Sequence, residues 1–122
     1  MGKITGYLVD VVNKTNGPVE VDGTLEDYYR VLNCDIFDIT NREIGRKRFD
    51  IMCDDEGLLK SNPIPSALDV FNRCALVGNL FIVKHDEEGN TVSLTFSEIE
   101  YIDDYVYKVG LDARPMLTEV DY

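Results

Sequence analysis

Long apolar runs are missing from this sequence of 122 residues. The longest, at residues 75–83, has the length of a strand and falls short of the roughly 20 residues that cross a bilayer as a helix. The first six residues also lack the apolar segment of a signal peptide. We therefore expect neither a membrane span nor a signal peptide.

Histidine and cysteine, which often carry nucleophilic or metal chemistry, are also few. His85 is the single histidine, and its polar neighbours are typical of a solvated turn. The cysteines Cys34, Cys53 and Cys74 are widely spaced, lack a C-x-x-C pair and sit beside apolar residues, which favours buried free thiols in a reducing compartment. A calcium loop does not fit residues 86–97, and there is no glycine-rich phosphate loop. The sequence predicts no catalytic residue, no metal site and no cofactor.

Positive charge is in short supply. The chain has 12 Lys and Arg against 23 Asp and Glu, which gives a net charge of −11. A field of this sign repels nucleic-acid phosphates and anionic membranes and attracts basic surfaces. We therefore expect no direct binding to nucleic acid or to a membrane. Solubility alone is the plainer interpretation of the charge.

Acidic residues gather in two places. Thr95 and Glu98 form the capping-box pattern that starts a helix, and one acidic group follows on that predicted helix. Like charges three or four residues apart on a helix cost roughly 0.2–0.5 kcal/mol per pair. They form either a solvated face or an acidic strip that imitates phosphates and docks on a basic groove. The candidate partner-binding residues are Glu100, Asp103 and Asp104 on the predicted helix, and Asp86, Glu87 and Glu88 in the turn before it.

The cations are concentrated too. Arg42, Arg46, Lys47 and Arg48 hold four of the 12 positive charges within seven residues. This group is either an anion-binding patch or, as is more common, a hairpin end that is paired with nearby carboxylates.

Secondary-structure signals alternate between strands and two helices. Thr24 is a candidate helix cap, and Leu25, Tyr28, Tyr29 and Leu32 follow it at the spacing of one apolar helix face. We predict strands at residues 4–12, 19–22, 35–40, 46–53, 75–83 and 91–94, with turns at 13–18 and 41–43 and a loop at 58–69. Gly78, inside the apolar run, indicates a bulge or a close backbone approach.

These signals predict an α+β fold. We expect a single domain over residues 1–104, with an antiparallel or mixed sheet of about five or more strands and two helices packed on it. Residues 105–122 are expected to form a C-terminal extension that is part strand and, over residues 112–122, a loose tail.

The order of these features resembles that of a known family. An N-terminal hairpin is followed by Asp-Gly-Thr-Leu-Glu-Asp at 22–27, Cys-Asp-Asp-Glu-Gly-Leu at 53–58, an Asn-Pro loop at 62–67, the strand at 75–83 and Ser-Leu-Thr at 93–95. This resembles, over most of residues 4–104, a family of small phage and mobile-element proteins that is known only as a domain of unknown function. The tail and the Arg-Lys-Arg cluster depart from the pattern. The resemblance implies a bacterial cytoplasmic setting and no active site.

Three functions are compatible with the charge, the motifs and the family resemblance. The first is a non-enzymatic protein of a phage or mobile element that binds a basic surface of a host protein, and in its sharpest form inhibits a defence nuclease. The second is an enzyme or a small metal- or ligand-binding domain with a carboxylate site. The third is an accessory module that forms oligomers through sheet edges or residues 105–107.

Overall fold

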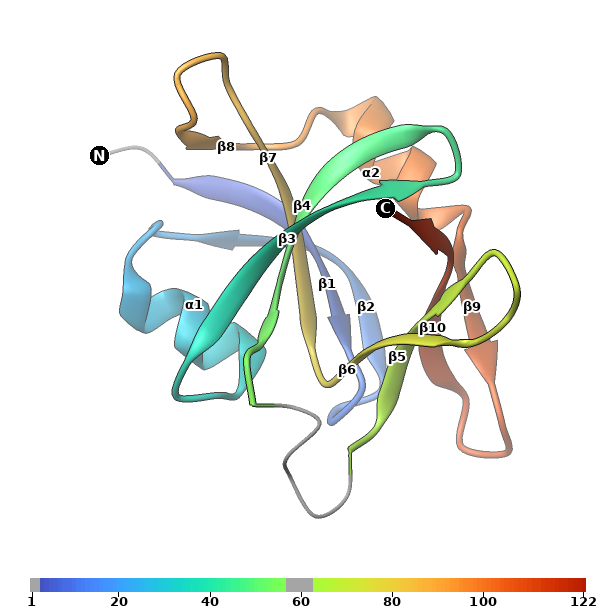
Figure 1. The fold of residues 1–122 in the computed structure, drawn as a ribbon. Helices are drawn as coiled ribbons and strands as arrows, with labels where there is room; N and C mark the ends of the chain where they lie inside the picture. Colours follow the sequence, from blue (N-terminus) through green and yellow to red (C-terminus); the bar gives the residue numbers. More distant parts are fainter. Residues whose placement is uncertain (1–2, 57–62) are drawn as a thin grey trace.

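The computed structural model describes residues 3–56 and 63–122, and within them the chain forms ten strands and two helices (Figure 1). No helix among these residues is long and apolar enough to cross a membrane. The elements, in chain order, are β1 (Ile4–Asp10), β2 (Thr15–Val21), α1 (Leu25–Leu32), β3 (Phe37–Ile44), β4 (Lys47–Asp54), β5 (Pro65–Asp69), β6 (Cys74–Val77), β7 (Leu80–His85), β8 (Thr91–Val92), α2 (Phe96–Asp103), β9 (Val106–Val109) and β10 (Arg114–Asp121).

All ten strands belong to one mixed sheet. The order is β2-β1-β7-β4-β3-β10-β5-β6, with β8 added to β7 and β9 added to β10. The pairing of β10 with β5 is parallel and the others are antiparallel. The predicted α+β class with two helices is therefore confirmed, although the chain is mostly sheet.

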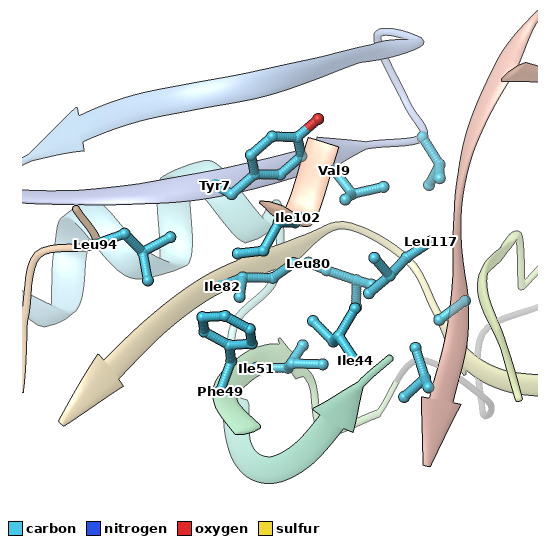
Figure 2. Packing of buried hydrophobic residues seen from close by; sticks show 13 residues of the cluster. Tyr7, Val9, Ile44, Phe49, Ile51, Leu80, Ile82, Leu94, Ile102 and Leu117 are labelled. Carbon is cyan, nitrogen blue, oxygen red and sulfur yellow. The ribbon is translucent and has the colours of Figure 1, made fainter. Parts of the chain in front are cut away.

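The main core lies on the α2 side of this sheet, and the sheet curls around it. Strands β1 and β10 are separated by three strands in the sheet order, yet both contribute to the same cluster (Figure 2). The cluster consists of Tyr7, Val9, Val11, Ile44, Phe49, Ile51, Ala67, Leu80, Ile82, Leu94, Ile102, Leu117 and Val120.

A second, smaller core lies under α1 on the opposite face. Successive residues of a strand point to opposite faces. Accordingly Leu80 and Ile82 of β7 join the main core, whereas Phe81 and Val83 pack with residues of α1. All four side chains are fully buried, which explains why this stretch of sequence is apolar without alternation.

The prediction of one strand over residues 75–83 is wrong. Strand β6 ends at Val77 and pairs with β5, whereas β7 begins at Leu80 between β1 and β4. Gly78 has φ +76°, a conformation that favours glycine, and it breaks the strand. Asn79 follows this break and contacts a residue of each core. Its side chain accepts a hydrogen bond from the backbone of Val11, in the main core, and donates one to the carbonyl of Val31, in α1.

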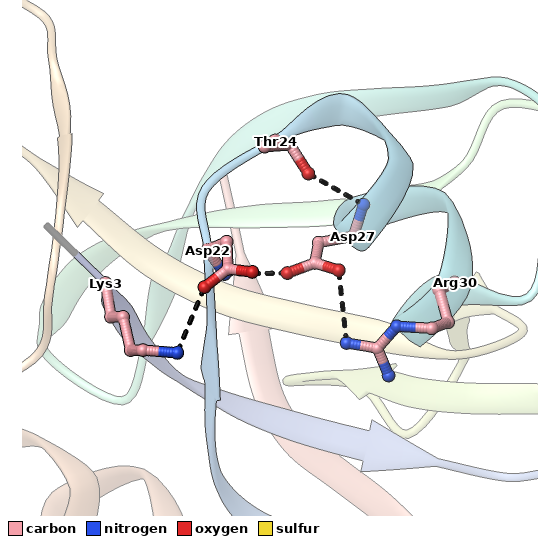
Figure 3. Close-up of polar contacts among 5 residues, drawn as sticks. All are labelled: Lys3, Asp22, Thr24, Asp27 and Arg30. Atoms are coloured by element: carbon pink, nitrogen blue, oxygen red, sulfur yellow. Dashed lines mark hydrogen bonds and ion pairs between the residues drawn. The ribbon is translucent and has the colours of Figure 1, made fainter. Parts of the chain in front are cut away.

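Both predicted helix starts are confirmed. Thr24 accepts a hydrogen bond from the Asp27 backbone (Figure 3). Beside this cap, the Asp27 carboxylate accepts hydrogen bonds from the Asp22 backbone and the Arg30 side chain, and Lys3 donates to the Asp22 side chain.

In α2, both reciprocal bonds of the capping box between Thr95 and Glu98 are present. The predicted apolar faces hold only in part. Leu25 and Phe96, each the first residue of its helix, are exposed, whereas Val31 is buried in α1.

Two predicted turns lie elsewhere. Residues 41–43 belong to β3, and the chain reverses at Gly45, whose φ is +64° and where a side chain would collide with the hydroxyls of Tyr101 and Tyr105. The first hairpin turns before Thr15, so that Pro18 lies within β2. A proline is tolerated there because β2 is an edge strand.

The predicted loop at 58–69 and the loose tail also need correction. Residues 58–62 lie outside the described residues, but 65–69 form β5, with Pro65 at its first position. Residues 106–109 are a strand, as expected, but 114–121 form β10 and are not loose. Leu117 and Val120 are fully buried, and β10 joins β3 to β5. Glu119 has φ +56° and interrupts the alternation that identifies a strand.

Candidate functional site

Helix α2 carries the first acidic group and is attached to the sheet by polar contacts at both ends. Near its start, Glu98 forms a 2.9 Å ion pair with Lys84 of β7. Burial alone would raise the pKa of Glu98, but the hydrogen bonds from the Thr95 backbone and from Lys84 outweigh it and lower the pKa. Near its end, the Tyr7 hydroxyl of β1 donates to Asp103 over 2.5 Å. Asp103 therefore has a structural role.

The other two acids of α2 lack such partners. Glu100 and Asp104 are exposed, and neither forms an ion pair with a cation in the part of the chain that the structure describes. Asp104 also lies at the C-terminal end of the helix, where the dipole disfavours negative charge. Five other cations and His85 form ion pairs within the described residues: Lys3 with Asp22, Lys14 with Asp112, Arg30 with Asp27, Arg73 with Asp69, Lys84 with Glu98 and His85 with Asp50.

The second acidic group lies in the turn between β7 and β8. Asp86 accepts hydrogen bonds from the backbone of Glu88 and Asn90, each 2.9 Å long, and thus holds the turn together. The bond from Asn90 is the main cause that lowers the pKa of Asp86. Glu87 and Glu88 are exposed. This turn and α2 occupy the same end of the molecule (Figure 1), and the Lys84–Glu98 pair links the strand that enters the turn to the helix.

The four clustered cations do not share one surface. Arg42 is buried, with its guanidinium 3.8 Å from the centre of the Tyr122 ring and hydrogen-bonded to the Tyr122 hydroxyl. Lys47 lies over the Tyr101 ring, and the Arg46 backbone donates to the Tyr101 hydroxyl. The cause is strand alternation: residue 42 lies on the main-core side of β3, whereas Arg48 lies on the α1 side of β4.

Arg48 instead begins a chain of polar side chains across three neighbouring strands. It donates to Asn41 of β3 at 3.1 Å, and the Asn41 amide donates to Asp50 of β4 at 3.0 Å. The second oxygen of Asp50 lies 2.6 Å from Nδ1 of His85 at the end of β7. These residues, together with Lys84 and Phe49, line a hollow of about 330 Å³.

His85 was predicted to be a solvated turn residue, and it is exposed, but it belongs to a strand and is bound to Asp50. His85 ends β7 and is about half exposed (51%), whereas the Asp50 side chain that orients it is 11% exposed. The two residues are 35 positions apart, and only the antiparallel pairing of Asp50 with Val83 brings them together on one face. No local motif in the sequence could have found this pair.

The cysteines contribute no ligand cluster. Cys74 is exposed, so the prediction of three buried cysteines fails there. Cys53 is partly buried, and burial raises the pKa of its thiol to about 11, which disfavours the reactive thiolate. In the described ranges 3–56 and 63–122, no group of three or more His, Cys, Asp and Glu side chains comes together as a metal site.

Comparison with known proteins gives a family. A model of DUF3846, a domain of unknown function, matches residues 4–107. The chain belongs to the DUF3846 family. No curated protein and no solved structure matches it.

The DUF3846 region contains α2, the β7–β8 turn and the hydrogen-bonded side chains of Arg48, Asn41, Asp50 and His85. Strand β10 lies beyond the matched residues. Two kinds of chemistry are thus available in the family region. One is a rigidly attached helix with unpaired carboxylates. The other is an oriented imidazole beside an arginine in a hollow.

Proposed function

We propose that this DUF3846 protein is a non-enzymatic protein of a phage or mobile element that binds a basic surface of a host protein. The contacts are made by Glu100 and Asp104 of α2 and by Glu87 and Glu88 of the β7–β8 turn, which together we call the acidic end. A surface that normally binds nucleic acid fits best, because its positive field attracts exposed carboxylates as it attracts phosphates.

One observation carries this proposal. Six acids outside the acidic end, or at its attachment points, have cationic partners, whereas Glu100 and Asp104 have none among the described residues. Glu100 and Asp104 are four residues apart on one helix, where unpaired like charges destabilise it slightly, so their persistence there favours a use outside the fold.

The attachment of α2 supports the same conclusion. The helix buries only Ile102, but Lys84–Glu98 and Tyr7–Asp103 fix both of its ends to the sheet. A fixed helix loses little freedom on binding, so its carboxylates bind a complementary surface at lower entropic cost than those of a flexible tail.

Affinity capture from host lysate with matched variants tests the proposal. The wild type is compared with Glu100→Gln/Asp104→Asn and with Glu20→Gln/Glu26→Gln, two exposed acids of β2 and α1. Both variants lose two charges, so nonspecific attraction falls equally in both. We expect a partner that is captured by the wild type and by the control variant Glu20→Gln/Glu26→Gln. Glu100→Gln/Asp104→Asn, the α2 variant, should not capture it.

The purified partner then provides the quantitative measurement. Electrostatic steering predicts an association rate that falls with salt, and the α2 variant should lower this rate at least about tenfold at low salt. Equal losses in the two variants would show that only the net charge matters and would refute the acidic end as a binding surface. If the partner binds nucleic acid, the wild type should compete with that binding and the α2 variant should not.

A further inference from the structure

The polar chain on the α1 face ends in two side chains, Arg48 and His85, that keep nitrogens without a hydrogen-bond partner among the described residues. Both oxygens of Asp50 are occupied, by Asn41 and by His85, and both ends of the Asn41 amide are occupied as well. What remains is the outer nitrogen of His85, Nε2, and the N–H groups of Arg48 other than the one given to Asn41. Both side chains are exposed and line the same hollow.

The hydrogen bond to Asp50 fixes how His85 acts. A carboxylate only accepts, so Nδ1 carries a proton and the ring orientation is set. When protonated, His85 directs an N–H outward from Nε2, beside an arginine whose planar fork matches an oxygen anion.

The charges around His85 are mostly engaged with one another. Across the sheet it faces Arg48 and Asp50 of β4. On its own segment it lies between Lys84, which is paired with Glu98 of α2, and Asp86, which is engaged by its own turn. Glu43 of β3 is the register partner of Arg48. Two cations therefore stand against four carboxylates around His85, so binding of an anion would depend on the N–H groups of Arg48 and His85 that line the hollow and not on net local charge.

From this arrangement we propose that the hollow is a binding site for an oxyanion group, phosphate or carboxylate, of a small molecule. Arg48 and protonated His85 hold the anion, Asn41 and Asp50 position these two side chains, and Lys84 lies at the rim. This site is separate from the residues of the acidic end, and the proposal does not rest on the function proposed above.

Titration of the full chain with sulfate and with acetate, followed by NMR of the His85 ring and the Arg48 side chain, tests the site. Sulfate stands in for phosphate and keeps its charge over the whole range, so any pH dependence belongs to the protein. We expect saturable shifts with a Kd on the order of 1 mM at about pH 6, weakening at about pH 8 as histidine loses its proton. Tighter binding of sulfate identifies a phosphate-type ligand, and tighter binding of acetate a carboxylate.

Matched variants separate a built site from general attraction. Arg48→Gln and His85→Gln should each weaken binding about tenfold, whereas Arg46→Gln, with the same loss of charge at the hairpin end, should change it less than about twofold. Asp50→Asn should weaken the pH dependence, because the imidazole loses its charged partner. Unchanged melting temperatures of these variants confirm the fold.

The absence of saturable shifts with either anion, or an equal effect of Arg46→Gln and Arg48→Gln, would overturn the proposal. Binding that is independent of pH in the wild type would remove His85 from the site.

Discussion

The two helices have equal lengths, and each is capped by a threonine, but only α1 has a basic residue in its last turn. Beside α1, Asp27 pairs with Arg30 and Asp22 pairs with Lys3 (Figure 3). On α2, the last turn has no basic residue, and Glu100 and Asp104 have no cationic partner among the described residues. α1 buries three residues and α2 only one. α1 is thus held mainly by its buried face, whereas α2 carries two acids that no described cation neutralises, and these are the acids that we propose contact a partner.

The largest expected effect tests how α2 is attached. Ile102 is its single buried residue and is fully enclosed in the main core. Ile102→Ala should lower the free energy of unfolding by about 2–5 kcal/mol, measured by urea denaturation. Phe96→Ala, at an exposed position of the same helix, is the control and should change stability little. Equal effects of the two substitutions would mean that α2 does not depend on the core.

A smaller effect is expected from the polar attachment. Tyr7→Phe removes the hydroxyl that donates to Asp103 and should cost about 1–2 kcal/mol at neutral pH. Burial, and then Asp103, raise the pKa of Tyr7 above its ordinary value. A raised pKa means that the stabilisation is complete below about pH 10 and is lost as the pH rises beyond it.

Wild type and Tyr7→Phe should therefore converge in stability at strongly alkaline pH, as measured by urea melts across that range. The thiol of Cys53, whose pKa burial raises to about 11, also destabilises the fold as pH rises, but it does so in both proteins and cancels. A constant difference across the whole range would contradict a role for the Tyr7 proton.

The smallest effect has the opposite sign. Asp104→Asn removes a charge at the unfavourable end of the helix dipole and next to Glu100, and it should raise stability by about 0.3–0.5 kcal/mol, measured by thermal melting. If the same substitution weakens partner binding, the acid is retained at a cost to the fold. A loss of stability would show that Asp104 has a structural role like that of Asp103.

Features set by neighbouring residues could be predicted from the sequence, and features set by strand register could not. The caps at Thr24 and Thr95 lie three residues from the groups they bind, so both helices and their start points were predicted correctly. The Asp50–His85 pair depends on which strand lies beside β4, and periodicity does not contain this information.

The predictions of one strand over residues 75–83 and of a loose tail over residues 112–122 were wrong for a related reason. A glycine within an apolar run is compatible with a bulge as well as with a complete break, and only the different partners of β6 and β7 decide between them. In β10, the left-handed residue Glu119 disturbs the alternation, and burial of Leu117 comes from distant strands. Among the six acids that the sequence singled out as candidates for partner binding, it did not show that Asp86 and Asp103 are engaged within the fold.

The position of β10 has a consequence for biosynthesis. This strand is translated after the other nine described strands, yet it supplies the hydrogen-bonded connection between β3 and the β5–β6 pair. While the chain emerges from the ribosome, the hairpin of β5 and β6 therefore has no neighbouring strand to join, and its edge stays open until residues 114–121 have been made. Completion of the sheet is a late event that a stalled or shortened chain would not reach.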